Sequence, residues 1–252
     1  MPGRAFAFLM AAVLVYAGLC AALFVFQRAL LYLPQPRVLA QASKFSLPVD
    51  GAELVVTSRI EDSPQALIYF GGNAEDVSSS LPDLARAFAG QAVYLLHYRG
   101  YGGSTGSPSQ AALYADALAL YDHVRERHEQ VAVVGRSLGS SVALHLASRR
   151  PIDRLVLVTP FDSIEALASR QFPIFPVRWL LLDKYEAWRD APQVTAPTRV
   201  LVAEHDTIVP RARTEALMAH FRPGVAELHV IEGRGHNSIG ADPRYLPLLA
   251  GR

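Results

Sequence analysis

The chain has 252 residues, of which 51% are hydrophobic and 19% charged, and its formal net charge at pH 7 is +1. This length accommodates one large domain or two small ones, and the composition excludes a disordered or collagen-like chain. A net charge near zero gives no electrostatic basis for binding nucleic acid, so no DNA or RNA partner is expected. The single cysteine, Cys20, excludes an internal disulfide framework and a cysteine-rich zinc site.

The first 45 residues differ in character from the rest, because they contain basic residues but no acidic one. Within them, residues 5–26 form an uncharged apolar run. A helix needs about 20 apolar residues to cross a ~30 Å hydrocarbon layer, so this run predicts a single transmembrane anchor. The alternative is a cleaved signal sequence, whose apolar region is usually about 7–15 residues long and ends in small residues. Here the run is longer and ends in Leu23, Phe24 and Phe26, which favours an uncleaved anchor.

The segment after the anchor, Phe26–Arg37, is an amphipathic linker. We expect it to rest on the membrane interface, with Tyr32 as an aromatic anchor. Basic residues flank the apolar run on both sides, with Arg4 before it and Arg28, Arg37 and Lys44 after it. This distribution favours a cytoplasmic C-terminal side only weakly, so the side of the membrane stays open. The boundary to the main domain is expected at residues 45/46.

Residues 46–252 alternate short aliphatic runs with longer helical patterns. The runs predicted as strands are Glu53–Ser58, Ala66–Phe70, Ala92–His97, Val131–Gly135, Arg154–Thr159, Arg199–Ala203 and Glu227–Ile231. The segments predicted as helices are Ser79–Gly90, Gln110–His128, Leu138–Ser148, Arg211–Phe221 and Pro243–Ala250. Continuous aliphatic runs are typical of strands buried on both faces. The alternation therefore indicates one α/β domain with a mostly parallel sheet flanked by helices.

One interval, about 160–197, interrupts this alternation between two predicted strands. It is long and apolar, and it contains Pro173 and Pro176. Two interpretations fit the pattern: a small cap over the domain, or an ordinary crossover whose apolar side chains pack on the sheet. The two are compatible with each other in part.

The strongest local motif is Gly135-Arg136-Ser137-Leu138-Gly139, which has the form Gly-x-Ser-x-Gly. An aliphatic strand precedes it and a helical pattern follows it, the context that a nucleophile elbow requires. Such a sharp turn raises the serine hydroxyl above the sheet edge and directs the helix N-terminus at the reacting oxygen. We therefore expect Ser137 to be a nucleophile rather than part of an ordinary glycine-rich turn.

A serine nucleophile needs a neighbouring base, and in this type of fold the chain order is Ser, acid, His. The histidines that follow Ser137 are His145, His205, His220, His229 and His236. The first, third and fourth fall within predicted helices or a strand, and His205 is too close in sequence to the acid candidate. His236 lies in a glycine-rich loop after the last predicted strand, from which it can reach back over the sheet edge. We expect His236 to be the base.

The acid is expected in a loop that follows a strand between the nucleophile and the base. Asp206 directly follows the run that ends at Ala203, and its role is to orient the imidazole and stabilise its cation. A helix-capping role for Asp206 is the alternative. Glu204 and Asp162 are the competing carboxylates.

The oxyanion is expected to be bound by two backbone N–H groups. One belongs to Leu138, the residue after the nucleophile. We assign the other to Asn73, in the turn Gly71-Gly72-Asn73-Ala74 after the second predicted strand. Glycines after a strand also bind phosphates, but the full Gly-x-Gly-x-x-Gly spacing and a Walker lysine are missing from the sequence. Nucleotide binding is therefore not expected.

Taken in order, these motifs resemble those of the α/β-hydrolases. More narrowly, the chain is similar to small, N-terminally membrane-anchored serine hydrolases, which include enzymes that remove palmitate from protein cysteines. The resemblance covers nearly the whole chain, through FQRALLYLP, GGNAED, YRGYGGSTGSPSQ, GRSLGSS, PFDSI, HDTIVP and GRGHN. It implies an α/β-hydrolase fold with Ser137, Asp206 and His236 as nucleophile, acid and base, and it implies that YRGYGGSTG shapes the entrance or braces the sheet edge.

The sequence departs from that resemblance at two places. Many α/β-hydrolases have His-Gly at the oxyanion turn, where this chain has Gly71-Gly72. The depalmitoylating enzymes carry a cysteine cluster near the N-terminus, whereas Cys20 lies inside the predicted span.

The expected activity is hydrolysis of a carboxylic ester or thioester through an acyl-enzyme, with no metal or organic cofactor. The apolar residues 172–182 and the anchor favour lipid-like or acylated substrates. A serine peptidase, and a membrane-tethered binding or scaffold protein that has lost turnover, are the alternatives. The physiological substrate, the acyl-chain length and the oligomeric state stay open.

Overall fold

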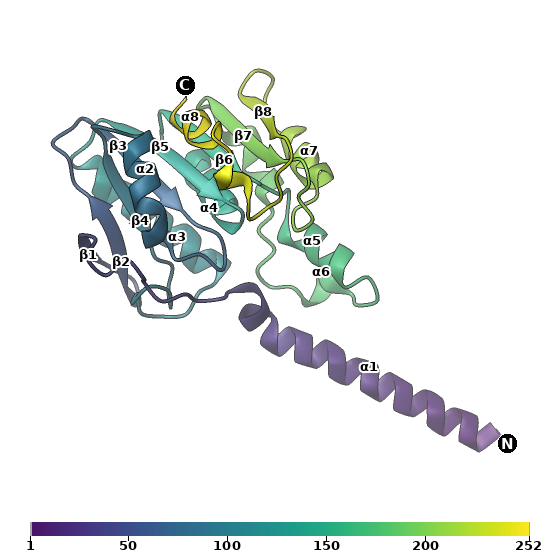
Figure 1. Cartoon of the computed structure of the whole chain (residues 1–252). Helices are drawn as coiled ribbons and strands as arrows, with labels where there is room; N and C mark the ends of the chain where they lie inside the picture. Colours follow the sequence, from purple (N-terminus) through teal and green to yellow (C-terminus); the bar gives the residue numbers. More distant parts are fainter. Residues whose placement is uncertain (1, 252) are drawn as a thin grey trace.

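The computed structural model describes residues 2–251 as an eight-stranded sheet with helices on both faces and a long N-terminal helix that projects from the domain (Figure 1). The strand order is β1-β2-β4-β3-β5-β6-β7-β8. The first two strands run antiparallel to their neighbours, and all pairs from β4 to β8 are parallel. The expectation of a mostly parallel α/β sheet is confirmed.

The strands agree closely with the aliphatic runs of the sequence. Their bounds are β1 Lys44–Val49, β2 Ala52–Arg59, β3 Gln65–Phe70, β4 Ala92–Leu96, β5 Gln130–Arg136, β6 Arg154–Val158, β7 Thr198–Ala203 and β8 Ala226–Ile231. Only β1 was not expected. Its sequence, KFSLPV, places a proline and mostly half-exposed side chains on the edge of the sheet, where a strand lacks the aliphatic signature of the interior. Because β1 starts at Lys44, the strand crosses the expected domain boundary.

The predicted helices are present with shifted ends, and two further helices, α5 and α6, lie in the interval 160–197 where no helix was predicted. Their bounds are α1 Pro2–Leu31, α2 Leu81–Ala87, α3 Gln110–Arg125, α4 Leu138–Arg149, α5 Ile164–Gln171, α6 Val177–Leu180, α7 Arg211–Met218 and α8 Tyr245–Ala250. Short 3₁₀ turns are η1 Val77–Ser80, η2 Ala187–Arg189, η3 Ala191–Gln193 and η4 Ile239–Ala241.

Alternate side chains of the strands supply two apolar layers, one on each face of the sheet. Ile68 and Val133 face the layer that includes α3 and α4, whereas Leu67 and Val134 face the layer that includes α2 and α8. All of these strand residues are fully buried. The parallel strands therefore end together at one edge of a rigid sheet, where their loops can hold a site.

Helix α1 is the described helix long and apolar enough to cross a membrane by length and composition, over Arg4–Leu31. It carries the expected anchor run and continues through the start of the linker. Cys20 lies within it and is a free thiol.

The expectation that Tyr32 anchors the linker in the membrane interface is wrong. Its side chain is 3% exposed, and its hydroxyl is hydrogen-bonded to Asp183 Oδ2 (3.1 Å) and to the Tyr185 hydroxyl (2.8 Å). The linker beyond it also packs on the domain, where the Val38 N–H donates to Asp76. The amphipathic pattern of this segment reflects packing against protein rather than against lipid headgroups.

The interval 160–197 contains both of the structures that the sequence allowed. Its first part, through α5 and α6, projects from the carboxyl edge of the sheet beside α1 and forms a small cap (Figure 1). Its second part, through η2 and η3, packs on the apolar core with Ala187, Ala191 and Val194 fully buried. We use the term cap for residues 163–183.

Candidate active site

Ser137 lies in a strained turn between β5 and α4. Its backbone has φ 51° and ψ −117°, a conformation that residues other than glycine rarely adopt. The turn is held by the Ser137 N–H, which donates to the carbonyl of Val158 at 2.9 Å. Strain of this kind at a Gly-x-Ser-x-Gly sequence is the geometry of a nucleophile elbow.

The glycines that flank the serine are required by close backbone approach. A Cβ on Gly135 would lie 2.3 Å from the carbonyl oxygen of Gly139, and one on Gly139 would lie 2.2 Å from the carbonyl oxygen of Phe70. Helix α4 therefore starts directly against the ends of β5 and β3. This contact brings the helix N-terminus, with its partial positive charge, to the same edge as the oxyanion turn.

The structure brings together the three side chains that the sequence singled out. His236 Nε2 lies 3.1 Å from Ser137 Oγ, and His236 Nδ1 lies 2.7 Å from Asp206 Oδ2. The side chains of His236 and Asp206 are 8% and 3% exposed, so water has little access to the pair. Such a chain of contacts orients one imidazole nitrogen towards the serine while the other is held by the carboxylate.

The loop after β7 presents Asp206 in a defined orientation. Asp206 Oδ1 accepts hydrogen bonds from the N–H groups of Ile208 (2.9 Å) and Val209 (2.7 Å), which leaves Oδ2 for the imidazole. The carboxylate thus holds its own loop and the histidine together, so the capping and orienting roles considered for this residue coexist.

The competing residues face other partners. Asp162 forms an ion pair with Arg213 at 3.1 Å, and Glu204 accepts the Gly233 N–H at 2.8 Å. Of the other histidines, His145 contacts Asp190 and stacks on Tyr114. The remaining ones lie on exposed or edge positions beside Glu204, Trp188 and Glu227: His205, His220 and His229.

The oxyanion turn, residues 71–74, lies beside Ser137. A Cβ on Gly72 would stand 3.8 Å from Ser137 Cβ, ordinary contact distance. Among residues 2–251, neither the Asn73 N–H nor the Leu138 N–H donates to another protein group. The carbonyl and side-chain amide of Asn73 are occupied, by Tyr101 and by the carbonyl of Leu31. The pairing of the two N–H groups as an oxyanion hole stays a prediction.

Two charged residues that the sequence analysis did not assign hold this turn. Glu75 accepts hydrogen bonds from the Gly72 N–H (2.9 Å) and the Tyr69 hydroxyl (2.7 Å), and it pairs with Arg136 at 3.1 Å. Arg136 also reaches the carbonyl of His236 at 3.5 Å. Burial disfavours the cation, but the Glu75 carboxylate raises the pKa of Arg136 overall, so the ion pair persists. This pair connects the elbow, the oxyanion turn and the histidine loop.

The signals for both residues were present in the sequence. Arg136 is a charged residue inside an elbow that otherwise needs small or apolar residues, and Glu75 belongs to the GGNAED segment. Nothing in the local sequence shows, however, that two residues 61 positions apart meet.

The segment YRGYGGSTG braces the sheet edge, and within residues 2–251 it contributes no side chain to the Ser137–His236 contact. The Tyr98 hydroxyl donates to the Gly71 carbonyl (2.9 Å). The Tyr101 hydroxyl donates to the Asn73 carbonyl (2.7 Å) and accepts the Leu33 N–H (2.8 Å). Because burial raises the pKa of Tyr101 to about 12, its hydroxyl keeps its proton and remains a donor at neutral pH.

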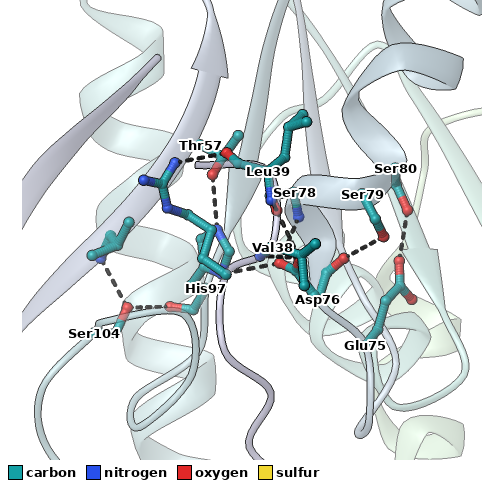
Figure 2. A network of polar contacts seen from close by, with 12 residues as sticks. Val38, Leu39, Thr57, Glu75, Asp76, Ser78, Ser79, Ser80, His97 and Ser104 are labelled. Atoms are coloured by element: carbon teal, nitrogen blue, oxygen red, sulfur yellow. Dashed lines mark hydrogen bonds and ion pairs between the residues drawn. The ribbon is translucent and has the colours of Figure 1, made fainter. Parts of the chain in front are cut away.

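A second polar network lies next to the oxyanion turn (Figure 2). Asp76 accepts from the Val38 N–H (2.7 Å) and from Ser78, while buried His97 is hydrogen-bonded through Nε2 to Thr57 Oγ1 (2.8 Å). Burial lowers the pKa of His97 to about 4, so the imidazole is neutral at physiological pH. The network fixes the chain after the turn to the linker from α1.

Gly102 explains how the His97 ring is enclosed. A Cβ at this position, where φ is +58°, would lie 1.9 Å from His97 Nδ1. Within residues 2–251, no group of three or more His, Cys, Asp and Glu side chains is arranged to hold a metal ion, in this network or elsewhere.

The fold and this geometry agree with comparisons with known proteins. The family profile for the α/β-hydrolase fold matches residues 66–181. The uncharacterized protein Rv2307c of Mycobacterium tuberculosis is 34% identical, over 92% of this chain and 87% of the relative. The chain therefore belongs to the α/β-hydrolase family.

Two proteins similar to this chain are named as enzymes, a lipase and an esterase. Lysophosphatidylserine lipase ABHD12 of Danio rerio is 32% identical over 48% of this chain and 37% of its own length. Among solved structures, an esterase of Pyrococcus furiosus superposes with a TM-score of 0.68 at 17% identity, covering 87% of this chain and 97% of the esterase, which shows the shared fold. Together these findings support a hydrolase of the lipase or esterase kind.

Proposed function

We propose that the protein is a membrane-anchored serine hydrolase that cleaves carboxylic ester or thioester bonds of lipid-like or acylated substrates. The observation that carries the proposal is the chain of contacts from Asp206 through His236 to Ser137 at a strained elbow. It supplies an activated nucleophile, its base and the group that orients the base.

The proposed reaction has two steps. His236 takes the proton of Ser137 as the hydroxyl attacks the carbonyl carbon, and the N–H groups of Asn73 and Leu138 bind the developing oxyanion. The imidazolium, stabilised by Asp206, then protonates the leaving alcohol or thiol as its bond to the acyl carbon breaks. Water, deprotonated by His236, hydrolyses the acyl-enzyme and releases the acid and free Ser137.

Two features support a lipid-like substrate. The site is connected through its oxyanion turn to an apolar helix of the length that spans a membrane. In addition, the relative named lysophosphatidylserine lipase shares the matched region with this chain. An ester linking an acyl chain to a polar group is the substrate class that both features favour.

The test is to treat the full-length protein in detergent, beside its Ser137→Ala variant, with a fluorophosphonate probe and with short-chain p-nitrophenyl esters. We expect covalent labelling and turnover in the wild type. In the variant we expect no labelling and a loss of turnover on the order of 10⁶-fold. A folded wild-type protein that is neither labelled nor active would refute the proposal and favour the scaffold alternative. Turnover that is retained after Ser137→Ala would refute the serine mechanism.

A further inference from the structure

The cap is attached along the side of the apolar helix α1. At one end, Arg28 forms an ion pair with Asp183 at 2.9 Å. At the same end, the Gln27 side chain donates to the Leu180 carbonyl (3.1 Å) and accepts the Leu182 N–H (2.7 Å). The cap therefore follows α1 rather than lying only on the sheet.

The contact extends far along the helix. The Tyr16 hydroxyl donates to the Ile174 carbonyl at 2.8 Å, and the Tyr16 ring stacks on Phe175 with centroids 5.8 Å apart. Tyr16 precedes Arg28 by twelve positions, which at 1.5 Å per residue corresponds to about 18 Å along the helix axis. A cap segment of this reach lies beside half of the apolar run.

This reach determines where the membrane must lie. If the cap stayed in water, only the helix before Tyr16 would be free to enter the bilayer, and residues 5–15 span only about 17 Å. The hydrocarbon layer is about 30 Å thick. The uncharged stretch between Arg4 and Arg28, at about 35 Å, matches this thickness, but only if the cap enters the same layer.

The outer surface of the cap is suited to lipid. Four large apolar side chains are exposed there: Phe172 (38%), Ile174 (71%), Trp179 (85%) and Leu182 (55%). Large apolar side chains exposed this close together in sequence mark an interaction site. Its position beside a membrane-spanning helix makes the bilayer its partner.

Between α1 and the cap lies an apolar cavity of about 180 Å³ that is open to the surface. Its walls include Leu23, Leu30 and Leu31 from α1, and Ile164, Ala168 and Phe172 from the cap. A cavity of ~150 Å³ lined by apolar side chains accommodates one benzene molecule. This cavity is therefore of a size for a short segment of one alkyl chain.

One wall of the cavity is joined to the candidate active site by a hydrogen bond. Leu31 lines the cavity, and its carbonyl accepts a hydrogen bond from the side-chain amide of Asn73 at 2.9 Å. Asn73 is the residue whose N–H is proposed to bind the oxyanion. A chain lying in the cavity would therefore contact Leu31, the residue of α1 that is bonded to the turn beside Ser137.

We propose that the cap is embedded in the bilayer beside α1, and that the cavity between them binds the single acyl chain of the substrate as it enters from the membrane. The second part rests on the proposed hydrolase function; the first does not. The bilayer then delivers the substrate laterally, so the anchor is a wall of the substrate site as well as a tether.

The position of the cap is tested by the depth of Trp179. The full chain with Trp188→Phe, which leaves Trp179 as the only tryptophan, is reconstituted in phosphatidylcholine vesicles whose acyl chains are brominated close to the headgroups, the depth that corresponds to Leu180 beside Gln27. We expect a loss of most of the Trp179 emission, and little quenching by aqueous acrylamide. The matched control is Trp179→Phe, in which Trp188 reports from the folded domain and is not quenched by the bromolipid. Acrylamide quenching without bromolipid quenching of Trp179 would overturn the embedded cap.

The cavity is tested by narrowing it. Ala168→Trp fills the groove, whereas Ser169→Trp places the same side chain one position further on α5, where it is exposed and outside the lining. Each methylene displaced from an apolar site costs about fourfold in kcat/KM. Ala168→Trp is therefore expected to lower kcat/KM for p-nitrophenyl dodecanoate at least about tenfold, and to lower it much less for the butyrate ester. Ser169→Trp is expected to leave both unchanged.

The outcomes separate the two proposals. Turnover of the butyrate ester shows that the hydrolase is active and folded. If the Ala168→Trp and Ser169→Trp variants then respond equally to acyl-chain length, the cavity does not bind the acyl chain, and the proposed hydrolase function still stands. A wild type without any esterase activity would overturn the proposed function, and with it the role of the cavity in catalysis. The quenching measurement needs no turnover and decides the position of the cap in either case.

Discussion

On the histidine side of the candidate active site, two neighbouring loops hold the catalytic candidates largely through their own backbone. The loop after β7 fixes the Asp206 carboxylate with the N–H groups of Ile208 and Val209. It is joined to the next loop by the His205 N–H, which donates to the Arg234 carbonyl at 2.8 Å. These contacts join residues that are close in sequence, or loops that follow adjacent parallel strands.

The oxyanion side is held by side chains from distant parts of the chain. Gly72 is bound by Glu75, which in turn is paired with Arg136 from the elbow. Asn73 is bound by Tyr101 and by the carbonyl of Leu31 at the end of the apolar helix. The position of this turn therefore depends on the anchor and on the elbow.

Because of this difference, catalysis is expected to respond differently to substitutions on the two sides of the site. A change on the histidine side acts on proton transfer directly, because His236 contacts the serine and Asp206 contacts His236. A change on the oxyanion side acts through the position of a backbone N–H group. Its effect on kcat therefore increases gradually with the displacement of that group. The anchor is joined to the second side, so any influence of the membrane on catalysis is expected to act through the oxyanion turn.

The largest effect is expected from Asp206→Asn. An amide in place of the carboxylate holds the imidazole in the wrong tautomer and does not stabilise its cation, so kcat on a short ester is expected to fall about 10⁴-fold. The control is Asp162→Asn, which removes the charge paired with Arg213 and is expected to leave kcat near the wild-type value. If only the Asp162 variant is inactive, the acid has been assigned to the wrong residue.

The sequence predicted the histidine side because its signals are local. An aspartate directly after a buried strand and a histidine in a glycine-rich loop after the last strand are visible without knowledge of the fold. Their order along the chain, after Gly-x-Ser-x-Gly, completed the pattern, and the structure brings these side chains within hydrogen-bonding distance. The parallel sheet was predictable for a similar reason, because aliphatic runs in alternation with helical patterns specify it.

The oxyanion side and the linker were less predictable because they depend on contacts across the chain. Tyr32 belongs to a stretch whose local pattern is amphipathic, yet its hydroxyl partner Asp183 is 151 positions away. Strand β1 pairs at the edge of the sheet and includes Pro48, so it lacks an aliphatic signature. Helix ends shifted where another residue caps the first turn. The helix expected from Ser79 is preceded by the 3₁₀ turn η1, which has Asp76 as its N-cap.

A smaller effect is expected from Glu75→Gln, which removes the charge that pairs with Arg136. Glutamine has one acceptor oxygen, so it cannot accept from the Tyr69 hydroxyl and, at the other oxygen, from the Gly72 N–H and Arg136 at the same time. Deleting an oxyanion donor costs about 10²–10³ in rate, and displacing one costs less, so kcat is expected to fall roughly tenfold to a hundredfold with little change in KM. Separate measurement of kcat and KM on a short ester checks this.

The control for this variant is Glu61→Gln, at a half-exposed ion pair with Arg59 away from the site. It is expected to change neither constant. A Glu75 variant that loses thermal stability but keeps its wild-type kcat would show that the ion pair is structural only, and would remove the distinction drawn between the two sides.

A smaller effect is expected from His97, which makes the free energy of unfolding depend on pH. Burial lowers its pKa to about 4, from 6.5 when exposed, so the unfolded chain binds this proton more readily than the folded one. Stability is therefore complete above pH 6.5 and falls as the pH drops towards 4, by about 2 kcal/mol at pH 5. Urea unfolding of the full chain in detergent at pH 7.5 and pH 5 measures this difference.

The matched variant is His97→Gln, which removes the titrating group but keeps an amide able to reach Thr57. Its unfolding free energy is expected to depend less on pH than that of the wild type, by the same ~2 kcal/mol. Identical pH profiles for the two proteins would show that the network of Figure 2 does not hold a neutral imidazole in the folded state.

The smallest effects on stability are expected from substitution of two buried tyrosines at the end of α1. One tyrosine connects this end to the cap, and the other connects it to the oxyanion turn. Tyr32→Phe removes the hydroxyl bonded to Asp183 of the cap and to Tyr185 just after it. Tyr101→Phe removes the hydroxyl bonded to Leu33 and to Asn73 of the oxyanion turn. Each loss of a buried hydrogen-bonding hydroxyl is expected to cost about 1–2 kcal/mol. For a chain of this size the midpoint then falls by roughly 2–4 °C per kcal/mol.

The two variants are expected to differ in catalysis, although their stabilities change alike. Tyr101→Phe leaves the Asn73 carbonyl with only the longer hydrogen bond from the Leu33 N–H (3.1 Å), so the turn is less well fixed and kcat on a short ester falls by a few fold. Tyr32→Phe leaves the turn intact, and its kcat stays at the wild-type value. An equal fall in kcat in both variants would mean that the cap, too, positions the oxyanion turn. Catalysis would then depend on the whole junction between α1 and the domain rather than on the contacts to Asn73.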